Sequence, residues 1–249
     1  MKAVGLSADV IVVTSRIWQT TCTLVRNGEE AFVIDSPVLP DELELLPAVA
    51  DQAGFRVVGR LATHADWDHV LAGYAFPDAP LGVPESSAPR LRDGSAQRRL
   101  REFDEQHYVE RPGPLTLPSP QILPVPGRCD IGESELELHA ATGHTEDGMV
   151  VWAPWARVLI CGDYLSPVEI PMVRDRDAYL ATLERIEPLV GEADWVVPGH
   201  GAPLESERAL AILREDRAYL EGFPDAPLPL ARRTAEQQKI HAANTGRLG

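Results

Sequence analysis

Short apolar runs, each ended by polar residues, open the chain. The runs VIVVTS, TTCTLV and AFVID predict paired strands, and Arg26-Asn27-Gly28-Glu29 between the last two is typical of a hairpin turn. Apolar residues at helical spacing after Pro40 predict a helix that Gly54 can close. The run RVVGRLAT then predicts a buried strand that leads directly into the polar string HADWDH, and VLAGYAF after it predicts a helix.

The second half of the chain repeats this order after an irregular segment. Residues 85–120 are rich in Arg, Glu and Pro, with one short helical candidate at 96–103, and we expect an insertion or lid there. Strand patterns return at QILPV, ELELHAA, MVVWAP and RVLICGD, before a helix, the strand ADWVV and a last helix. Two blocks of strands, each followed by helices, suggest two sheets packed face to face with helices outside, an αββα sandwich. We expect one domain over 1–222 and a weakly specified tail over 223–249 that packs or frays.

Composition narrows the class of protein. At 249 residues and 44% hydrophobic, the chain can bury a large core as one domain. A formal net charge of −15 disfavours nucleic acid and anionic membranes as partners, and favours a small molecule. Three scattered cysteines, Cys22, Cys129 and Cys161, are too few for a disulfide framework, and we interpret them as core residues. With no apolar leader or membrane span in view, we expect a cytoplasmic protein.

Four predicted strand ends finish in residues that can bind metals. They are THADWDH at 63–69, TGHT at 142–145, CGD at 161–163 and PGH at 198–200. In an extended segment His64 and Asp66 project to the same side, while Asp68 and His69 open the following helix. A glycine precedes the later histidines and the aspartate, which allows tight turns beside a metal centre.

Imidazole and carboxylate are the ligands expected of Zn, Fe or Mn, and two clustered ions need about six or seven of them. The strand-end strings supply that number, and we predict a metal site built from His64, Asp66, Asp68, His69, His144, Asp163 and His200. The other three histidines, His107, His139 and His241, lie outside these strings and are interpreted as ordinary core or surface residues.

Together these strings resemble the metallo-β-lactamase superfamily, whose pattern is HxHxDH, a His after Gly, a bridging Asp and a final His. The resemblance covers about residues 9–200. It implies an αββα sandwich of two mixed β-sheets flanked by helices, and hydrolytic chemistry with two divalent ions, zinc first and iron or manganese as alternatives. By the same resemblance His64 and His144 would hold one ion and Asp68, His69 and His200 the other. Asp163 would bridge the two.

Asp66 is the departure from that pattern, because the family usually has a histidine there. As a ligand, its carboxylate would add negative charge and a harder donor, which favours Fe or Mn over Zn. Asp66→His should then raise the relative affinity for Zn. The alternative is that Asp66 only hydrogen-bonds a ligand histidine, leaving a mononuclear or weakly occupied first site.

Other residues carry weaker signals. Asp35 and Ser36 could support the metal loops, although a plain turn explains them nearly as well. Tyr164 could donate a phenolic hydrogen bond, but we interpret it as a core or rim residue. An arginine cluster could contact an anionic substrate, but a solvated helix face is the preferred interpretation; it comprises Arg90, Arg92, Arg98, Arg99 and Arg101.

The expected function is a metal-dependent hydrolase that uses a metal-bound hydroxide on a small ester, thioester, lactone or phosphodiester. Asp68 would bind metal and also orient that hydroxide. Because no candidate ligand lies in 85–120, removing this segment is expected to change substrate preference more than metal content. The alternatives are nucleic-acid processing, which the negative charge disfavours, and a metal-binding or sensor domain without efficient turnover.

Overall fold

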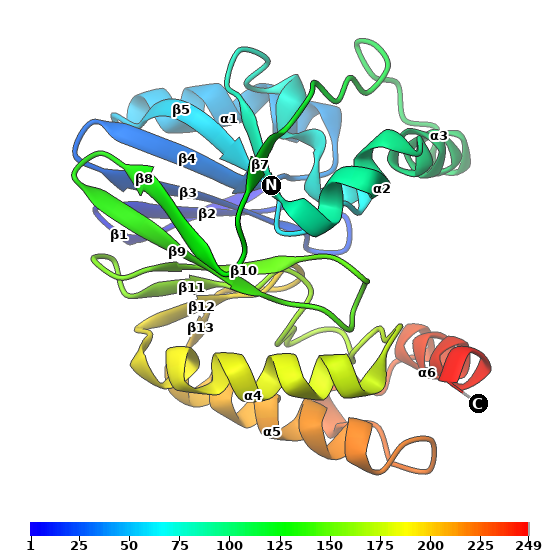
Figure 1. Cartoon of the computed structure of the whole chain (residues 1–249). Coiled ribbons are helices and arrows are strands. Elements are labelled where there is room, and N and C mark those ends of the chain that lie inside the picture. Colours follow the sequence, from blue (N-terminus) through cyan, green and yellow to red (C-terminus); the bar gives the residue numbers. More distant parts are fainter. Residues whose placement is uncertain (249) are drawn as a thin grey trace.

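Two β-sheets form the centre of the computed structural model, which describes residues 1–248 (Figure 1). The first sheet has the order β1-β2-β3-β4-β5-β6-β7 and the second β13-β12-β11-β10-β9-β8. The strands of the first sheet are β1 (Lys2–Ser7), β2 (Val10–Thr14), β3 (Thr21–Asn27), β4 (Glu30–Asp35), β5 (Arg56–Leu61), β6 (Leu81–Pro84) and β7 (Gln121–Leu123). Those of the second are β8 (Gly127–Ile131), β9 (Ser134–Ala140), β10 (Met149–Ala153), β11 (Val158–Ile160), β12 (Trp195–Val197) and β13 (Leu204–Glu205).

Helices cover the outer faces of both sheets (Figure 1). They are α1 (Pro40–Gln52), α2 (Ala88–Arg92), α3 (Ser95–His107), α4 (Arg176–Glu192), α5 (Ser206–Glu221) and α6 (Ala235–Leu248). Short 3-10 helices occupy Trp67–His69, Leu71–Tyr74, Glu85–Ser87 and Leu230–Arg232. Both sheets mix parallel and antiparallel pairs, so the predicted αββα sandwich of mixed sheets is confirmed.

Alternation along the strands explains the layers. Val10, Val12 and Ile34 of the first sheet meet Leu138 and Val151 of the second in a buried layer between the sheets. The residues that alternate with these along each strand face outward beneath the helices, where they form two further apolar clusters. Burying one such aliphatic side chain contributes about 1.5–3 kcal/mol, so these three layers stabilise the frame that carries the strand-end loops.

The predicted elements mostly form, with instructive exceptions. The Asn27-Gly28 hairpin joins antiparallel β3 and β4, with Gly28 at φ 60°. The helix predicted for VLAGYAF is wrong, because the chain forms only the four-residue 3-10 helix Leu71–Tyr74. The hydrophobic pattern also misses β1, β6, β8 and β13. β1 is a largely exposed edge strand, and β6 and β13 are short runs of four and two residues.

The C-terminal residues pack rather than fray. In α6, Gln237 Oε1 accepts a hydrogen bond from Ile170 N at 2.7 Å, and Asn244 Oδ1 accepts one from Val173 N at 3.0 Å. Arg232, just before α6, is buried and pairs with Asp216 of α5 at 2.6 Å. The segment is therefore an integral part of the second helical layer. Among residues 1–248 no helix is both long and apolar enough to cross a membrane.

Candidate metal centre

The site lies where several strands end. The chain leaves β5 at Leu61 and places His64, Asp66, Asp68 and His69 within eight residues. Asp163 follows β11 and His200 follows β12, while His144 lies on the connection between β9 and β10. Because the two sheets pack face to face, these ends meet at one edge of the sandwich.

Close approach of these loops depends on Gly199. A Cβ atom at this position would collide with the Asp163 carboxylate and with the backbone of Gly162. Gly199 N also donates a hydrogen bond to Gly162 O at 2.5 Å, which ties the two loops together. The glycine before His200 is thus needed because another metal-site loop passes against it.

All seven predicted residues converge. Their donor atoms form three overlapping groups, in each of which the atoms lie within 4.8 Å of one another: His64, Asp66 and His144; His64, His69 and Asp163; and Asp68, His69 and His200. We name the His64–Asp66–His144 set the first group and the Asp68–His69–His200 set the second group. The tertiary structure therefore brings together every residue that the strand-end strings predicted.

Asp163 lies between the two groups. Its Oδ2 is 3.1 Å from His144 Nε2 in the first group. Its Oδ1 is 3.1 Å from His69 Nε2 and 3.3 Å from His200 Nε2 in the second. One carboxylate thus faces both groups with different oxygens, which is the arrangement required of a bridging ligand.

The four histidines are held with Nε2 toward the centre because a polar group lies against each Nδ1, which for His69 is a nearby carboxylate and not a hydrogen bond. His144 Nδ1 donates to Met172 O at 3.0 Å, and His200 Nδ1 donates to Trp18 O at 3.1 Å. His69 Nδ1 lies 3.0 Å from Asp35 Oδ2. Such partners orient the imidazole of a metal ligand and set its tautomer.

His64 is oriented through a relay. Thr63 Oγ1 donates to Asp35 Oδ2 at 2.9 Å and can therefore accept from His64 Nδ1, 3.1 Å away. Asp35 also accepts from Thr63 N at 2.8 Å, and Ser36 Oγ donates to Asp68 O at 3.0 Å. Of the two interpretations of Asp35 and Ser36, support of the metal loops is the correct one.

The donor set fits divalent cations. Within residues 1–248, the buried atoms His64 Nε2, His69 Nε2, His144 Nε2 and Asp163 Oδ1 have no hydrogen-bond partner. Buried polar atoms are normally satisfied, so four atoms without protein partners that converge on one space fit a bound cation. Imidazole with carboxylate is a set that Zn, Fe and Mn accept.

The pKa values of the donor residues also show that the site favours bound positive charge. Burial by itself would lower the pKa of His144 and of His200, but Asp163 outweighs it and raises these values to about 10 and about 9. Burial would raise the pKa of Asp163, yet the surrounding imidazoles hold it well below its usual value. Without ions, the site therefore draws protons onto imidazoles that metal ions would otherwise occupy.

The arginine cluster departs from the solvated face that we expected. Arg90 is mostly buried on α2, and its Nη2 lies 2.5 Å from Asp66 Oδ1; Arg99 Nη1 of α3 is 3.3 Å from the same oxygen. The other three arginines of the cluster are exposed as expected; they are Arg92, Arg98 and Arg101. Segment 85–120 thus contacts a candidate ligand, which removes the basis for expecting its deletion to spare the metals.

Tyr164 is a core residue, as we interpreted it. It is buried, and its hydroxyl accepts a hydrogen bond from His144 N at 3.2 Å, so it supports the histidine loop from the core. Cys22 and Cys161 are buried as predicted, whereas Cys129 is only half-buried. His107, His139 and His241 lie outside the donor groups, as expected.

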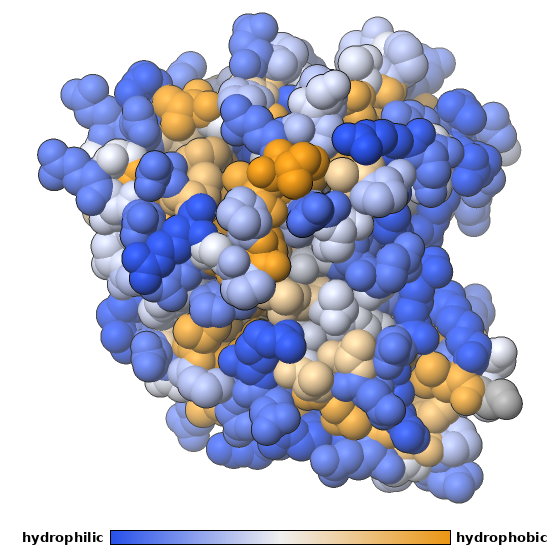
Figure 2. Space-filling view, viewed as in Figure 1, coloured by the Kyte–Doolittle hydropathy of each residue, from blue (hydrophilic) through white to orange (hydrophobic). Residues whose placement is uncertain are grey.

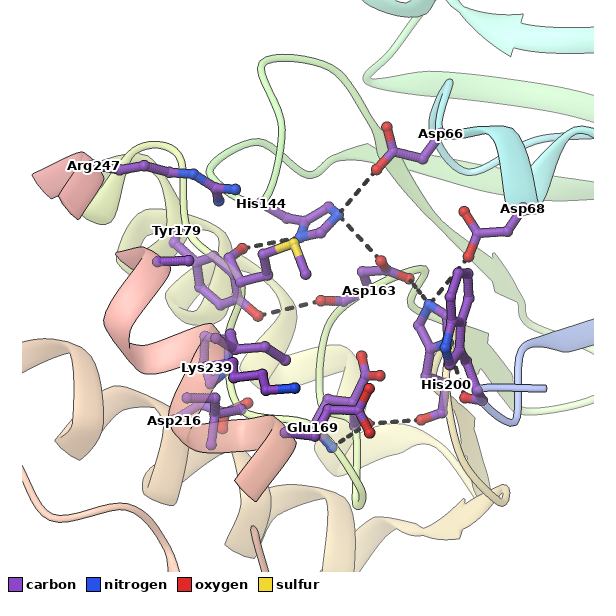
Figure 3. A pocket seen from close by; sticks show the side chains of 18 of the residues that line it. Asp66, Asp68, His144, Asp163, Glu169, Tyr179, His200, Asp216, Lys239 and Arg247 are labelled. Carbon is purple, nitrogen blue, oxygen red and sulfur yellow. Dashed lines mark hydrogen bonds and ion pairs between the residues drawn. The ribbon is translucent and has the colours of Figure 1, made fainter. Parts of the chain in front are cut away.

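A cavity of about 360 Å³ opens over the two groups. Its floor includes Asp66, Asp68, His144, Asp163 and His200, and its far wall is α6 (Figure 3). In Figure 2 the outline of the molecule is indented on the right, between the regions of α3 and α6 in Figure 1. The wall residues Trp18, Glu169, Lys239 and Arg247 belong to no local motif and were not among the predicted site residues.

The fold and site define an α/β sandwich with clustered metal-ligand side chains at one edge, and the sequence matches a known family. A family model described as the metallo-beta-lactamase superfamily matches residues 16–200. The chain belongs to this superfamily. Its membership and the clustered His and Asp donors indicate a metal-dependent hydrolase in general.

Solved structures share the fold at low sequence identity. The DIM-1 metallo-β-lactamase is 18% identical with a TM-score of 0.64, covering 88% of this chain and 96% of that one. A metallo-β-lactamase from Pontibacter korlensis is 19% identical with a TM-score of 0.60, covering 86% and 98%. The stereoselective inverting sec-alkylsulfatase Pisa1 from Pseudomonas sp. is 14% identical with a TM-score of 0.74, covering 99% of this chain but 50% of that one.

Proposed function

We propose that the protein is a hydrolase with two divalent ions, acting on a small ester, thioester, lactone or phosphodiester. The observation that carries the proposal is the position of Asp163, whose two carboxylate oxygens face different histidine groups at 3.1 to 3.3 Å. His64, Asp66 and His144 would hold one ion, and Asp68, His69 and His200 the other.

Bound divalent ions supply Lewis-acid chemistry, which acidifies water and polarises a carbonyl or phosphoryl oxygen. The chain's own groups would provide the rest. Asp68 lies with Oδ2 3.6 Å from His200 Nε2 and 3.8 Å from His69 Nε2, at the floor of the cavity. A carboxylate placed there can orient an attacking water toward the substrate and accept a proton from that water.

The cavity supports a small-molecule substrate. A volume of about 360 Å³ falls within the usual range for small-ligand sites. Its apolar lining comes from Trp18, Ile170 and Met172, while Arg99 and Lys239 add polar ends. An apolar wall keeps bulk water away from a bound substrate, which strengthens the electrostatic interactions at the reacting bond.

Metal content and turnover together test the proposal. Protein purified without chelator should contain two ions of Zn, Fe or Mn per chain by elemental analysis. It should hydrolyse at least one member of an ester, thioester, lactone and phosphodiester panel, and lose that activity on dialysis against EDTA. His144→Gln should lower both ion content and activity, whereas His107→Gln, an exposed histidine on α3, should change neither.

The outcomes separate the alternatives. Activity that survives complete removal of metal would refute the proposal. Two bound ions with no turnover on the panel would favour the metal-binding or sensor domain instead. Equal loss in both histidine variants would mean that the effect of His144→Gln reflects the fold and not the metal site.

A further inference from the structure

The two carboxylate oxygens of Asp66 face different partners. Oδ2 lies 3.9 Å from both His64 Nε2 and His144 Nε2, in the first group. Oδ1 points away from that group and accepts hydrogen bonds from Arg90 Nη2 at 2.5 Å and Arg99 Nη1 at 3.3 Å. The oxygen that could bind an ion is thus the one that the arginines leave free.

Arg90 is held in place by a second carboxylate. Its Nη1 donates to Asp147 Oδ1, and Asp147 is fully buried. The other oxygen of Asp147 accepts from Ala65 N at 2.9 Å and from Ser87 Oγ at 2.5 Å. A planar guanidinium with fixed donor directions can span two carboxylates in this way, whereas a lysine ammonium is a single point charge.

This network joins the two loops that carry the first group. Ala65 lies between His64 and Asp66, and Asp147 lies three residues after His144. Arg90 contacts both loops from α2, with its side chain only 12% exposed. Any rotation of the Asp66 carboxylate would therefore break its contact with Arg90, whose position Asp147 fixes independently.

We infer that Arg90 is a positioning residue that turns Asp66 Oδ2 toward the first group and balances the negative charge that this carboxylate adds. The inference rests on the proposed metal site and adds that ion binding in the first group requires Arg90 as well as the ligands. At the position where the superfamily pattern has a neutral histidine, this chain has an aspartate together with an arginine from the 85–120 segment. The two residues function as a pair.

The pair changes the expected result of Asp66→His. An imidazole at residue 66 would face a guanidinium that has lost one of its carboxylate partners, beside the ion of the first group. Arg90 keeps its pairs with Asp147 and Glu146, but the net charge beside that ion becomes one unit more positive, which opposes cation binding. Asp66→His alone should therefore weaken the first ion, and Arg90→Gln in the same chain should recover it.

A double-mutant cycle on ion binding tests this inference. Wild type, Arg90→Gln, Asp66→His and the double variant are stripped of metal and titrated with Zn²⁺ and Mn²⁺ against a chromogenic chelator. Arg90→Gln alone should weaken one of the two ions by roughly 10- to 100-fold, the range seen for partners of metal ligands. In the Asp66→His background the same change should cause no loss or a gain in affinity.

Two further variants separate charge, geometry and folding. Arg90→Lys keeps the charge but cannot span both carboxylates, so it should fall between wild type and Arg90→Gln. Arg92→Gln is the matched control, because Arg92 is exposed on the same helix and makes no ion pair within residues 1–248. Thermal unfolding of the metal-free proteins identifies any variant that fails to fold.

An arginine with a merely structural role would weaken ion binding equally in the wild-type background and in the Asp66→His background, and this result would overturn the inference. So would Arg90→Gln matching Arg92→Gln in both affinities. Failure of wild type itself to bind two ions would instead refute the proposed function, so the two failures are distinguishable.

Discussion

Asn244 provides a direct test of whether α6 forms the wall of the substrate cavity. Its side chain is fully buried and makes three hydrogen bonds, two to the loop between β11 and α4 and one to α5. Oδ1 accepts from Val173 N at 3.0 Å, and Nδ2 donates to Pro171 O at 2.7 Å and to Tyr219 Oη at 3.2 Å. Pro171 lines the cavity and Val173 follows two residues later, so these bonds fasten α6 to the cavity wall.

Asn244→Ala removes all three bonds and leaves a buried N–H and a carbonyl without partners. At about 1 kcal/mol net for each bond, docking of α6 should weaken by about 3 kcal/mol. Since about 1.4 kcal/mol is a factor of ten, the undocked population should rise by roughly two orders of magnitude. Two anchors of α6 remain, the hydrogen bond that Ile170 N donates to Gln237 Oε1 and the contact of His241 Nδ1 with Tyr219 Oη at 2.9 Å, so the helix should still dock.

Hydrogen exchange of the peptide 235–248 should accelerate in Asn244→Ala, and KM for a small substrate should rise. Ion content should be unchanged, because no donor of the metal groups lies on α6. Gln238→Ala, at an exposed position of the same helix, is the control and should behave as wild type. Unchanged hydrogen exchange in Asn244→Ala would refute this account. So would a loss of bound metal that accompanies the rise in KM.

Three further results are expected. Asp163→Ala should abolish binding of two ions and any hydrolysis, because no other described carboxylate faces both histidine groups; elemental analysis showing two ions would reassign Asp163 to packing. Binding of Zn²⁺ to the metal-free protein should release protons at pH 7, since the pKa values of about 10 for His144 and about 9 for His200 mean that both imidazoles start protonated. Apparent affinity should then increase from pH 7 toward pH 9, and calorimetry in buffers of different ionisation enthalpy measures the release; a pH-independent affinity contradicts it. Deleting residues 85–120 should lower ion content as well as alter substrate preference, because Arg90 is lost; full ion content would show that Asp66 needs no arginine.

The candidate ligands could be predicted from sequence because they lie in short strings at strand ends. The expected extended segment at His64 and Asp66 is instead a series of bends at 63–65, yet both side chains still reach the same donor group, and the strings at the ends of neighbouring strands meet at one edge. Most buried strands were equally readable, since residues buried on both faces form continuous apolar runs, whereas β6 is buried but only four residues long and was missed. The ligand strings and the buried strands both depend on the local order of residues, which can be read from the sequence alone.

Partners that approach through space could not be predicted in this way. Arg90 belongs to a cluster whose composition is typical of a solvated helix face, and only the packing of α2 against the 63–69 loop buries it against Asp66. Likewise, α6 has few apolar residues, and its place over the cavity depends on the buried amides of Gln237 and Asn244, which bond to a loop 67 and 71 residues earlier. Local patterns determine which residues can bind a metal, whereas contacts between distant segments determine their charge balance, their orientation and the wall that a substrate would meet.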